Sequence, residues 1–99
     1  MRLYVLVRSD LSAAYSSVQA GHALAEFMLR HPGRWSNETL VYLSVKNETE
    51  LERWGDLLRA SGAAVAEFHE PDIDNQLTAI AAQGADRMLR RLPLVKGEK

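Results

Sequence analysis

The sequence predicts an α/β fold, a three-layer α/β/α sandwich around a four-stranded mixed sheet with elements in the order β-α-β-α-β-β-α. Short apolar runs rich in β-branched and aromatic residues alternate with longer segments of helical spacing, and turn residues separate them. Strand–helix–strand units place parallel strands side by side with right-handed crossovers, and their helices cover both faces of the sheet. A chain of 99 residues is too short for two cores. We therefore expect a single domain over residues 1–99, with a frayed tail at 92–99.

The first half of the chain contains a strand, a helix and a second strand. Residues 2–8 form an apolar run that ends at turn residues, which is typical of a strand buried on both faces. Residues 13–30 have helical spacing, and Pro32-Gly33 ends that helix near His31. Residues 39–45 predict the second strand. The apolar side of the helix is expected at Val18, Leu24, Phe27 and Met28, beside a polar stripe of Tyr15, Gln19, His22 and Glu26.

The second half repeats the alternation. Asn47 and Glu50 make a capping box that opens the second helix, and Gly62 ends it. Its apolar face is expected at Leu51, Trp54, Leu57 and Leu58. Residues 63–69 and 77–81 predict the third and fourth strands, and residues 84–91 predict a short terminal helix.

Composition and charge exclude several classes of protein. The chain contains no cysteine, which excludes disulfides, thiolate nucleophiles and cysteine-ligated metal sites. It shows no signal peptide and no apolar window of the ~18 residues that a membrane span needs, so we expect a cytoplasmic protein without membrane contact. The net charge of −1 rules out a strongly basic surface. Basic residues still gather in two groups, which are either solvated faces or phosphate contacts: Arg30, His31 and Arg34, and Arg87, Arg90, Arg91, Lys96 and Lys99.

One constellation of polar residues has the pattern of a site. Gln19 and His22 lie one turn apart on the first helix, which begins where a strand ends, and ligands of α/β sheets bind at such strand ends. The polar segment 70–75 (EPDIDN) lies between two later strands and can meet them. Taken alone, His22 also fits a packed histidine and Gln19 a solvated residue. The 70–75 segment also has the composition of a plain turn, and it lacks the length, glycine and final glutamate of an EF-hand, so we expect no metal.

Two short segments of the chain resemble the sequence signature of a known family. Arg8-Ser9-Asp10-Leu11 and Gln19-Ala20-Gly21-His22-Ala23 are similar to the RxDL and AAQxxHA signature of the archaeal-type (type 2) peptidyl-tRNA hydrolases. The similarity continues through TLVYLSVKNETELERWGDLLRASGAAVAEF to the strand Leu77–Ala81, and covers about residues 2–82. It implies a four-stranded mixed sheet between helices, often in a homodimer, that hydrolyses the ester joining a peptide to tRNA and needs no cofactor.

The resemblance also has departures. The family helix begins with a Gly-Lys pair whose lysine is functional, and this chain has Ala14 and Tyr15 there. The 70–75 segment replaces a longer Asp-Ala-Gly-x-Thr loop, and the loop before the first helix is about two residues shorter than in the family. These departures leave two alternatives open. One is a peptidyl-tRNA hydrolase, and the other is a catalytically inactive homodimeric binding or regulatory domain of the same fold.

The resemblance and the chemistry of ester hydrolysis together assign roles. Imidazole suits a general base near neutral pH, which points to His22, and Glu70 or Asp72 is expected to orient its other ring nitrogen. Gln19 is expected to donate to the substrate carbonyl or phosphate, and Tyr15 to supply a neutral hydroxyl in place of the lysine. The expected substrate-binding residues are Asp10, Asn75, Thr78, Arg30, Arg34, Arg90 and Arg91.

Overall fold

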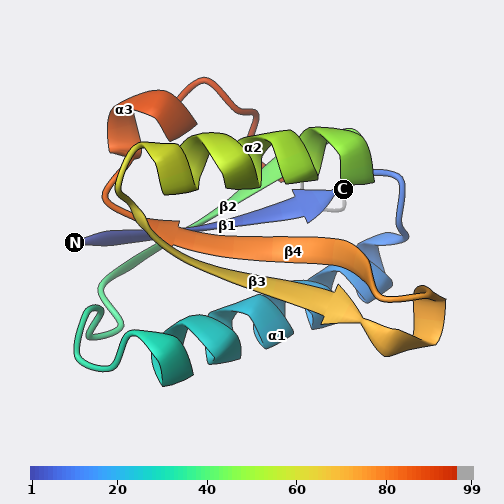
Figure 1. The fold of residues 1–99 in the computed structure, drawn as a ribbon, viewed down its shortest axis with the longest axis horizontal. Helices are drawn as coiled ribbons and strands as arrows, with labels where there is room; N and C mark the ends of the chain where they lie inside the picture. Colours follow the sequence, from blue (N-terminus) through green and yellow to red (C-terminus); the bar gives the residue numbers. More distant parts are fainter. Residues whose placement is uncertain (96–99) are drawn as a thin grey trace.

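The computed structural model describes residues 1–95, and it confirms the predicted fold class (Figure 1). Helix α1 (Ala13–Arg30) covers one face of a four-stranded mixed sheet, and α2 (Glu48–Ala60) and α3 (Asp86–Leu89) lie on the other. The strands are β1 (Arg2–Arg8), β2 (Thr39–Val45), β3 (Ala64–Glu70) and β4 (Gln76–Gln83), and a short 3₁₀ turn, η1 (Pro71–Ile73), joins the last two. No helix among residues 1–95 is both long and apolar enough to span a membrane.

The strands lie in the order β2-β1-β4-β3. β1 and β2 are parallel neighbours, as the first strand–helix–strand unit predicts. The expectation of side-by-side strands is wrong for the second unit. β4 pairs antiparallel with both β1 and β3, so it separates β3 from the other two parallel strands and leaves β3 at the far edge.

An irregularity in β4 determines which side chains reach α1. Phe68 on β3 lies opposite Ala79, but the next residue, His69, lies opposite Leu77, so Thr78 is an extra residue in β4. Such a bulge breaks the alternation of side chains. Ala79 belongs to the core under α1 and Leu77 to the core under α2, while Thr78 also turns toward α1.

The core has one cluster on each face of the sheet. Under α1 it contains Ala20, Ala23 and Phe27, and under α2 it contains Leu51 and Leu58. The expectation that Val18, Met28 and Leu57 are core residues is wrong, since all three are exposed. On α1 the buried face combines small residues, Ser16, Ala20 and Ala23, with the larger Gln19 and Phe27.

The helix ends follow the capping signals in the sequence. The Asn47 side chain accepts a hydrogen bond from the Glu50 N–H at 3.0 Å, which confirms it as the N-cap of α2. His31 is the C-cap of α1, and Gly62 adopts a φ of +85° just after α2.

The tail is more ordered than the sequence suggested. The Ser44 N–H donates to Pro93 O at 2.9 Å, and the Val95 N–H donates to Tyr42 O at 3.1 Å. Residues 93–95 therefore pair with the outer edge of β2, because an edge strand offers unpaired backbone groups. The expected fraying is wrong for this part, and residues 96–99 of the predicted tail lie outside the described residues.

Candidate functional site

A buried amide links α1, β4 and the end of β3. Gln19 is fully buried, and its Nε2 donates to Glu70 Oε1 at 2.9 Å. Its Oε1 accepts from the hydroxyl of Thr78 at 2.6 Å, and Thr78 is buried as well. The bulge in β4 makes this contact possible, because it turns Thr78 toward α1. Both ends of the Gln19 amide are thus used inside the protein.

This geometry corrects the expected roles of Gln19 and Thr78. In this structure the Gln19 side chain has no exposed surface, and its donor and acceptor are both occupied by protein groups. Gln19 instead fixes the position of Glu70, and Thr78 fixes Gln19. Both are positioning residues.

Glu70 receives hydrogen bonds from two directions. Oε1 accepts from Gln19, and Oε2 accepts from the Asp72 N–H at 3.3 Å in η1. The bond from Gln19 is the main reason that the pKa of Glu70 is lowered, and the Asp72 N–H and the nearby His22 lower it further. Glu70 is therefore held as a carboxylate, next to the histidine of the predicted site.

His22 lies on the exposed flank of α1 and is not a packed core residue. Its ring stacks on Phe68, with centroids 4.3 Å apart and planes 10° apart. The Glu70 carboxylate directs its hydrogen bonds to Gln19 and Asp72, so it acts on His22 through its charge. The expected hydrogen-bonded pair is corrected accordingly: stacking on Phe68 orients the ring, and Glu70 supplies a negative charge beside it.

Tyr15 lies one turn before Gln19, at the start of α1. Desolvation raises the pKa of its hydroxyl, and the charges of Glu70 and Asp72 raise it further. The phenol therefore stays protonated at neutral pH and remains a hydrogen-bond donor. The structure brings Tyr15, Gln19, His22, Glu70 and Asp72 together, and we call these five residues the α1–η1 cluster.

A second polar network anchors the strand ends beside this cluster. The buried guanidinium of Arg8 forms a two-pronged pair with Asp10, with both N–O distances at 2.9 Å, and also donates to Gln76 Oε1 and to Leu77 O. The pair lowers the pKa of Asp10, mainly through the hydrogen bonds from Arg8. Asp10 was expected to bind substrate, but its contacts hold Arg8 and, through it, the start of β4.

Asn75 was also expected to bind substrate, and it lies in the turn before β4. Asp74 and Asn75 both have a φ of +58°, and the Asn75 N–H donates to Glu70 O at 2.9 Å. Asparagine and aspartate tolerate this left-handed conformation better than other side chains do. Their role in the structure is to reverse the chain.

The basic groups lie away from the cluster. Arg30 is at the far end of α1, eleven residues after Gln19 or about 16 Å along the helix, and it pairs with Glu26. Arg34 follows in the next loop. α3 and the adjoining Arg90 and Arg91 lie at the end of β4 opposite η1, on the other face of the sheet from α1 (Figure 1). Lys96 and Lys99 lie outside the described residues. Among residues 1–95, the structure does not place the expected phosphate contacts Arg30, Arg34, Arg90 and Arg91 at the site.

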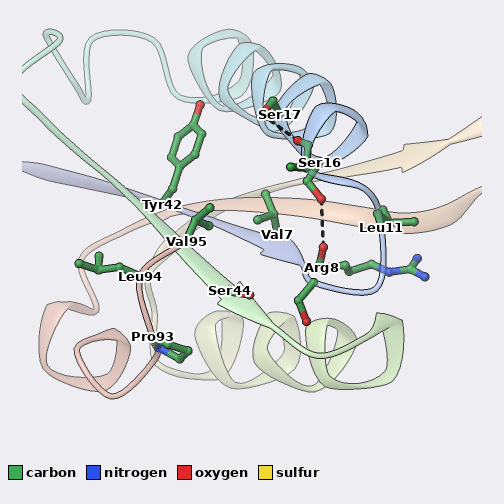
Figure 2. A pocket seen from close by; sticks show the side chains of 12 residues that line it. Val7, Arg8, Leu11, Ser16, Ser17, Tyr42, Ser44, Pro93, Leu94 and Val95 are labelled. Carbon is green, nitrogen blue, oxygen red and sulfur yellow. Dashed lines mark hydrogen bonds between the residues drawn. The ribbon is translucent and has the colours of Figure 1, made fainter. Parts of the chain in front are cut away.

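A cavity of about 670 Å³ lies on the opposite flank of α1 (Figure 2). Figure 2 shows Val7 and Tyr42 from the sheet, Val95 from the tail, and Ser16 and Ser17 from α1 around it. Its lining is mainly apolar and contains none of the α1–η1 cluster. Within residues 1–95, no group of three His, Asp or Glu side chains is arranged to hold a metal ion.

Sequence reasoning missed two contacts of the site. Phe68 is two residues before Glu70 on a strand, so the alternation of side chains already places both on one face. The Thr78 contact depends on the bulge, and no residue type in LTAIA signals a bulge. Comparison with known proteins adds no family assignment: no family model matches the chain, and no curated protein matches it.

Proposed function

We propose that this chain hydrolyses the ester bond between peptide and tRNA in peptidyl-tRNA, with the α1–η1 cluster as its site. The observation that carries the proposal is the hydrogen bond from the buried Gln19 to Glu70, which holds a carboxylate beside the exposed ring of His22. The four-stranded mixed sheet between helices and the sequence resemblance to type 2 peptidyl-tRNA hydrolases support it.

The chemistry assigns one step to each exposed group. His22 takes a proton from a water molecule, and the water oxygen attacks the ester carbonyl carbon. The Glu70 carboxylate lies near the ring during this step. The tetrahedral intermediate then collapses and breaks the bond to the ribose oxygen, which receives the proton from His22. The products are a peptide carboxylic acid and a tRNA with a free terminal hydroxyl.

In this scheme Tyr15 is the hydrogen-bond donor for the developing negative charge. Its protonated hydroxyl stabilises the oxyanion of the intermediate, which is a common role for neutral donors. A phenol carries no positive charge, so it replaces only the hydrogen bond of the family lysine and not its charge. We therefore expect slower turnover than a lysine at this position supports.

A non-catalytic binding domain is the second candidate. Two observations favour it. Tyr15 stands where the family has a lysine, and the arginine groups expected to hold phosphates lie away from the cluster. In this case the α1–η1 cluster is retained as a structural link between α1 and the β3–β4 turn, and homodimerisation is the remaining partner function.

A turnover assay on N-acetyl-aminoacyl-tRNA separates the two candidates. Hydrolysis above the rate without protein supports the enzyme, and we expect Tyr15→Lys to raise kcat or lower KM because it restores a cation. Phe68→Leu serves as a second probe, since loss of the stacking partner should lower kcat more than it changes KM. If both the wild type and Tyr15→Lys are inert, the hydrolase proposal is rejected in favour of the binding domain.

A further inference from the structure

The loops that follow β1 and β2 diverge at the carboxyl ends of these strands. The two strands are parallel neighbours, and the chain passes from β1 to α1 on one face of the sheet and from β2 to α2 on the other (Figure 1). In open α/β sheets, ligands bind in a crevice outside the carboxyl ends of the strands. The cavity of Figure 2 lies at this place, because Arg8 and Ser9 at the end of β1 and Ser44 near the end of β2 line it.

The cavity forms because α1 leaves β2 uncovered. α1 packs on β4, β3 and β1, so the side of β2 that carries Tyr42 and Ser44 faces a space beside the helix. Residues 93–95 bound this space, since the Ser44 N–H donates to Pro93 O at 2.9 Å and the Val95 N–H donates to Tyr42 O at 3.1 Å. The volume of about 670 Å³ is in the range of about 300–1,000 Å³ that is typical of small-molecule sites. We call this space the α1–β2 cavity.

The α1–β2 cavity offers no free charged side chain to a ligand. Arg8 is the only charged residue among the described residues that line it. The guanidinium of Arg8 is bound to Asp10 and Gln76, and Figure 2 shows it directed away from Tyr42. An ionised group in the cavity would lose its hydration without gaining a partner of opposite charge, which is costly. The cavity therefore favours a neutral ligand.

The α1 hydroxyls that line the cavity are already used as donors. Ser16 Oγ donates its hydrogen to Arg8 O, and Ser17 Oγ donates to Ala13 O, both at 3.0 Å. A serine hydroxyl has one hydrogen and two lone pairs, so an oxygen whose hydrogen is occupied can still accept. Toward a ligand, both serines are therefore acceptors, and they match a group that donates hydrogen bonds.

We propose that the α1–β2 cavity binds a small neutral molecule that has an apolar body and N–H donors at one edge. Val7, Leu11 and Val95 contact the apolar body, and the oxygens of Ser16 and Ser17 accept from the N–H groups. An aromatic ring that carries a primary amide has this chemistry. The cavity shares no residue with the α1–η1 cluster, so the proposal does not rest on ester hydrolysis.

Two ligands of the same shape test the proposal on the wild-type full chain. Indole-3-acetamide is neutral and has N–H donors, whereas indole-3-acetate replaces the amide by a charged carboxylate that cannot donate. Titration of isotope-labelled protein, followed by the backbone amide signals in NMR spectra, measures both affinities. We expect saturable shifts at Ser16, Ser17 and Ser44 with the amide, and at least about tenfold weaker binding of the acetate.

Ser44→Phe tests the location of the site. Ser44 lies on the same face of β2 as Tyr42, toward α1, so a phenylalanine there fills part of the cavity. It should abolish binding of the amide. Thr39→Phe is the matched control, because Thr39 is an exposed residue of the same strand outside the lining. It should bind the amide as the wild type does, and the thermal midpoints show whether both variants are folded.

Several results would overturn the proposal. One is the absence of saturable shifts up to about 5 mM amide, and another is an acetate that binds as tightly as the amide. Shifts that gather at His22 and Glu70 would place the ligand at the α1–η1 cluster instead. Binding that persists in folded Ser44→Phe would also exclude the cavity. If Ser44→Phe does not fold, the two ligands and the positions of their shifts on the wild type decide the outcome.

Discussion

The contact between Thr78 and Gln19 makes a quantitative prediction about stability. Thr78→Val keeps the shape of the side chain and removes the hydroxyl that donates to Gln19 Oε1 at 2.6 Å. Gln19 is fully buried, so its carbonyl oxygen is then left without a partner and without water. A buried unsatisfied polar group costs about 1–3 kcal/mol, and we expect Thr78→Val to lower the free energy of unfolding by that amount.

The double variant distinguishes this cause from simple loss of packing. Gln19→Leu alone leaves the Thr78 hydroxyl with only its weaker contact to Phe68 O at 3.3 Å. Gln19→Leu combined with Thr78→Val removes both polar groups, and replacing both partners by apolar groups is nearly neutral. The two losses should therefore not add, with a coupling of about 0.5–3 kcal/mol between them.

Urea unfolding of the four proteins at neutral pH measures the cycle. A loss of about 2 kcal/mol moves the midpoint by on the order of 1 M urea for a domain of this size. Strict additivity of the two single variants would refute the reasoning, and so would a loss below about 0.5 kcal/mol for Thr78→Val. Either result would mean that the Gln19 carbonyl oxygen finds another partner when the Thr78 hydroxyl is removed.

Three further predictions follow from single contacts. Gly21→Ala should stabilise the protein by about 0.5–1 kcal/mol, because the site is open. Gly55→Ala should give no such gain, because the new Cβ would lie 2.9 Å from Glu67 Oε2 and 3.1 Å from Ile80 Cδ1. Thermal unfolding of both variants tests this contrast, and equal gains in stability would contradict it. Folding lowers the pKa of Asp10, so the stability from its pair with Arg8 is present above the pKa of the unfolded chain and is lost as the pH falls through the lower folded pKa. Between pH 5 and about 2, Asp10→Asn should therefore lose less stability than the wild type. Parallel plots of unfolding free energy against pH for the two proteins would argue against the pair. The pKa of Glu70 is also lowered by folding, mainly by Gln19, so Gln19→Leu should reduce the loss of stability in acid. An unchanged pH dependence of the unfolding free energy would show that Gln19 does not lower the pKa of Glu70.

The fold was predictable because its signals are local. The apolar run of β1, the Asn47 cap and the Gly62 stop each act within a few residues, and the structure confirms all three. The position of β3 was not predictable in this way. It depends on β4 pairing between β1 and β3, which is a contact between segments far apart in the sequence.

The meeting of Gln19 and His22 with the 70–75 segment was predictable from the sequence, but the contacts that Gln19 makes were not. Helical spacing places Gln19 and His22 near one another, and the 70–75 segment does meet them. The sequence gives no sign that Gln19 is buried, because burial depends on Thr78 and on a bulge that breaks the strand pattern. The sequence also predicted the wrong buried face for part of α1. Val18 and Met28 have the spacing and size of core residues, yet alanines face the sheet and these two side chains face outward.

The most direct test of the proposed site is the rate at which His22→Ala hydrolyses N-acetyl-aminoacyl-tRNA, compared with the wild type and with His69→Ala. His69 is an exposed histidine on β3 whose contacts lie outside the α1–η1 cluster, so it controls for loss of an imidazole. If His22 is the general base, its replacement should lower kcat by about 10²–10⁴-fold with little change in stability, and His69→Ala should keep the wild-type rate. A His22→Ala protein that turns over as fast as the wild type would contradict the account.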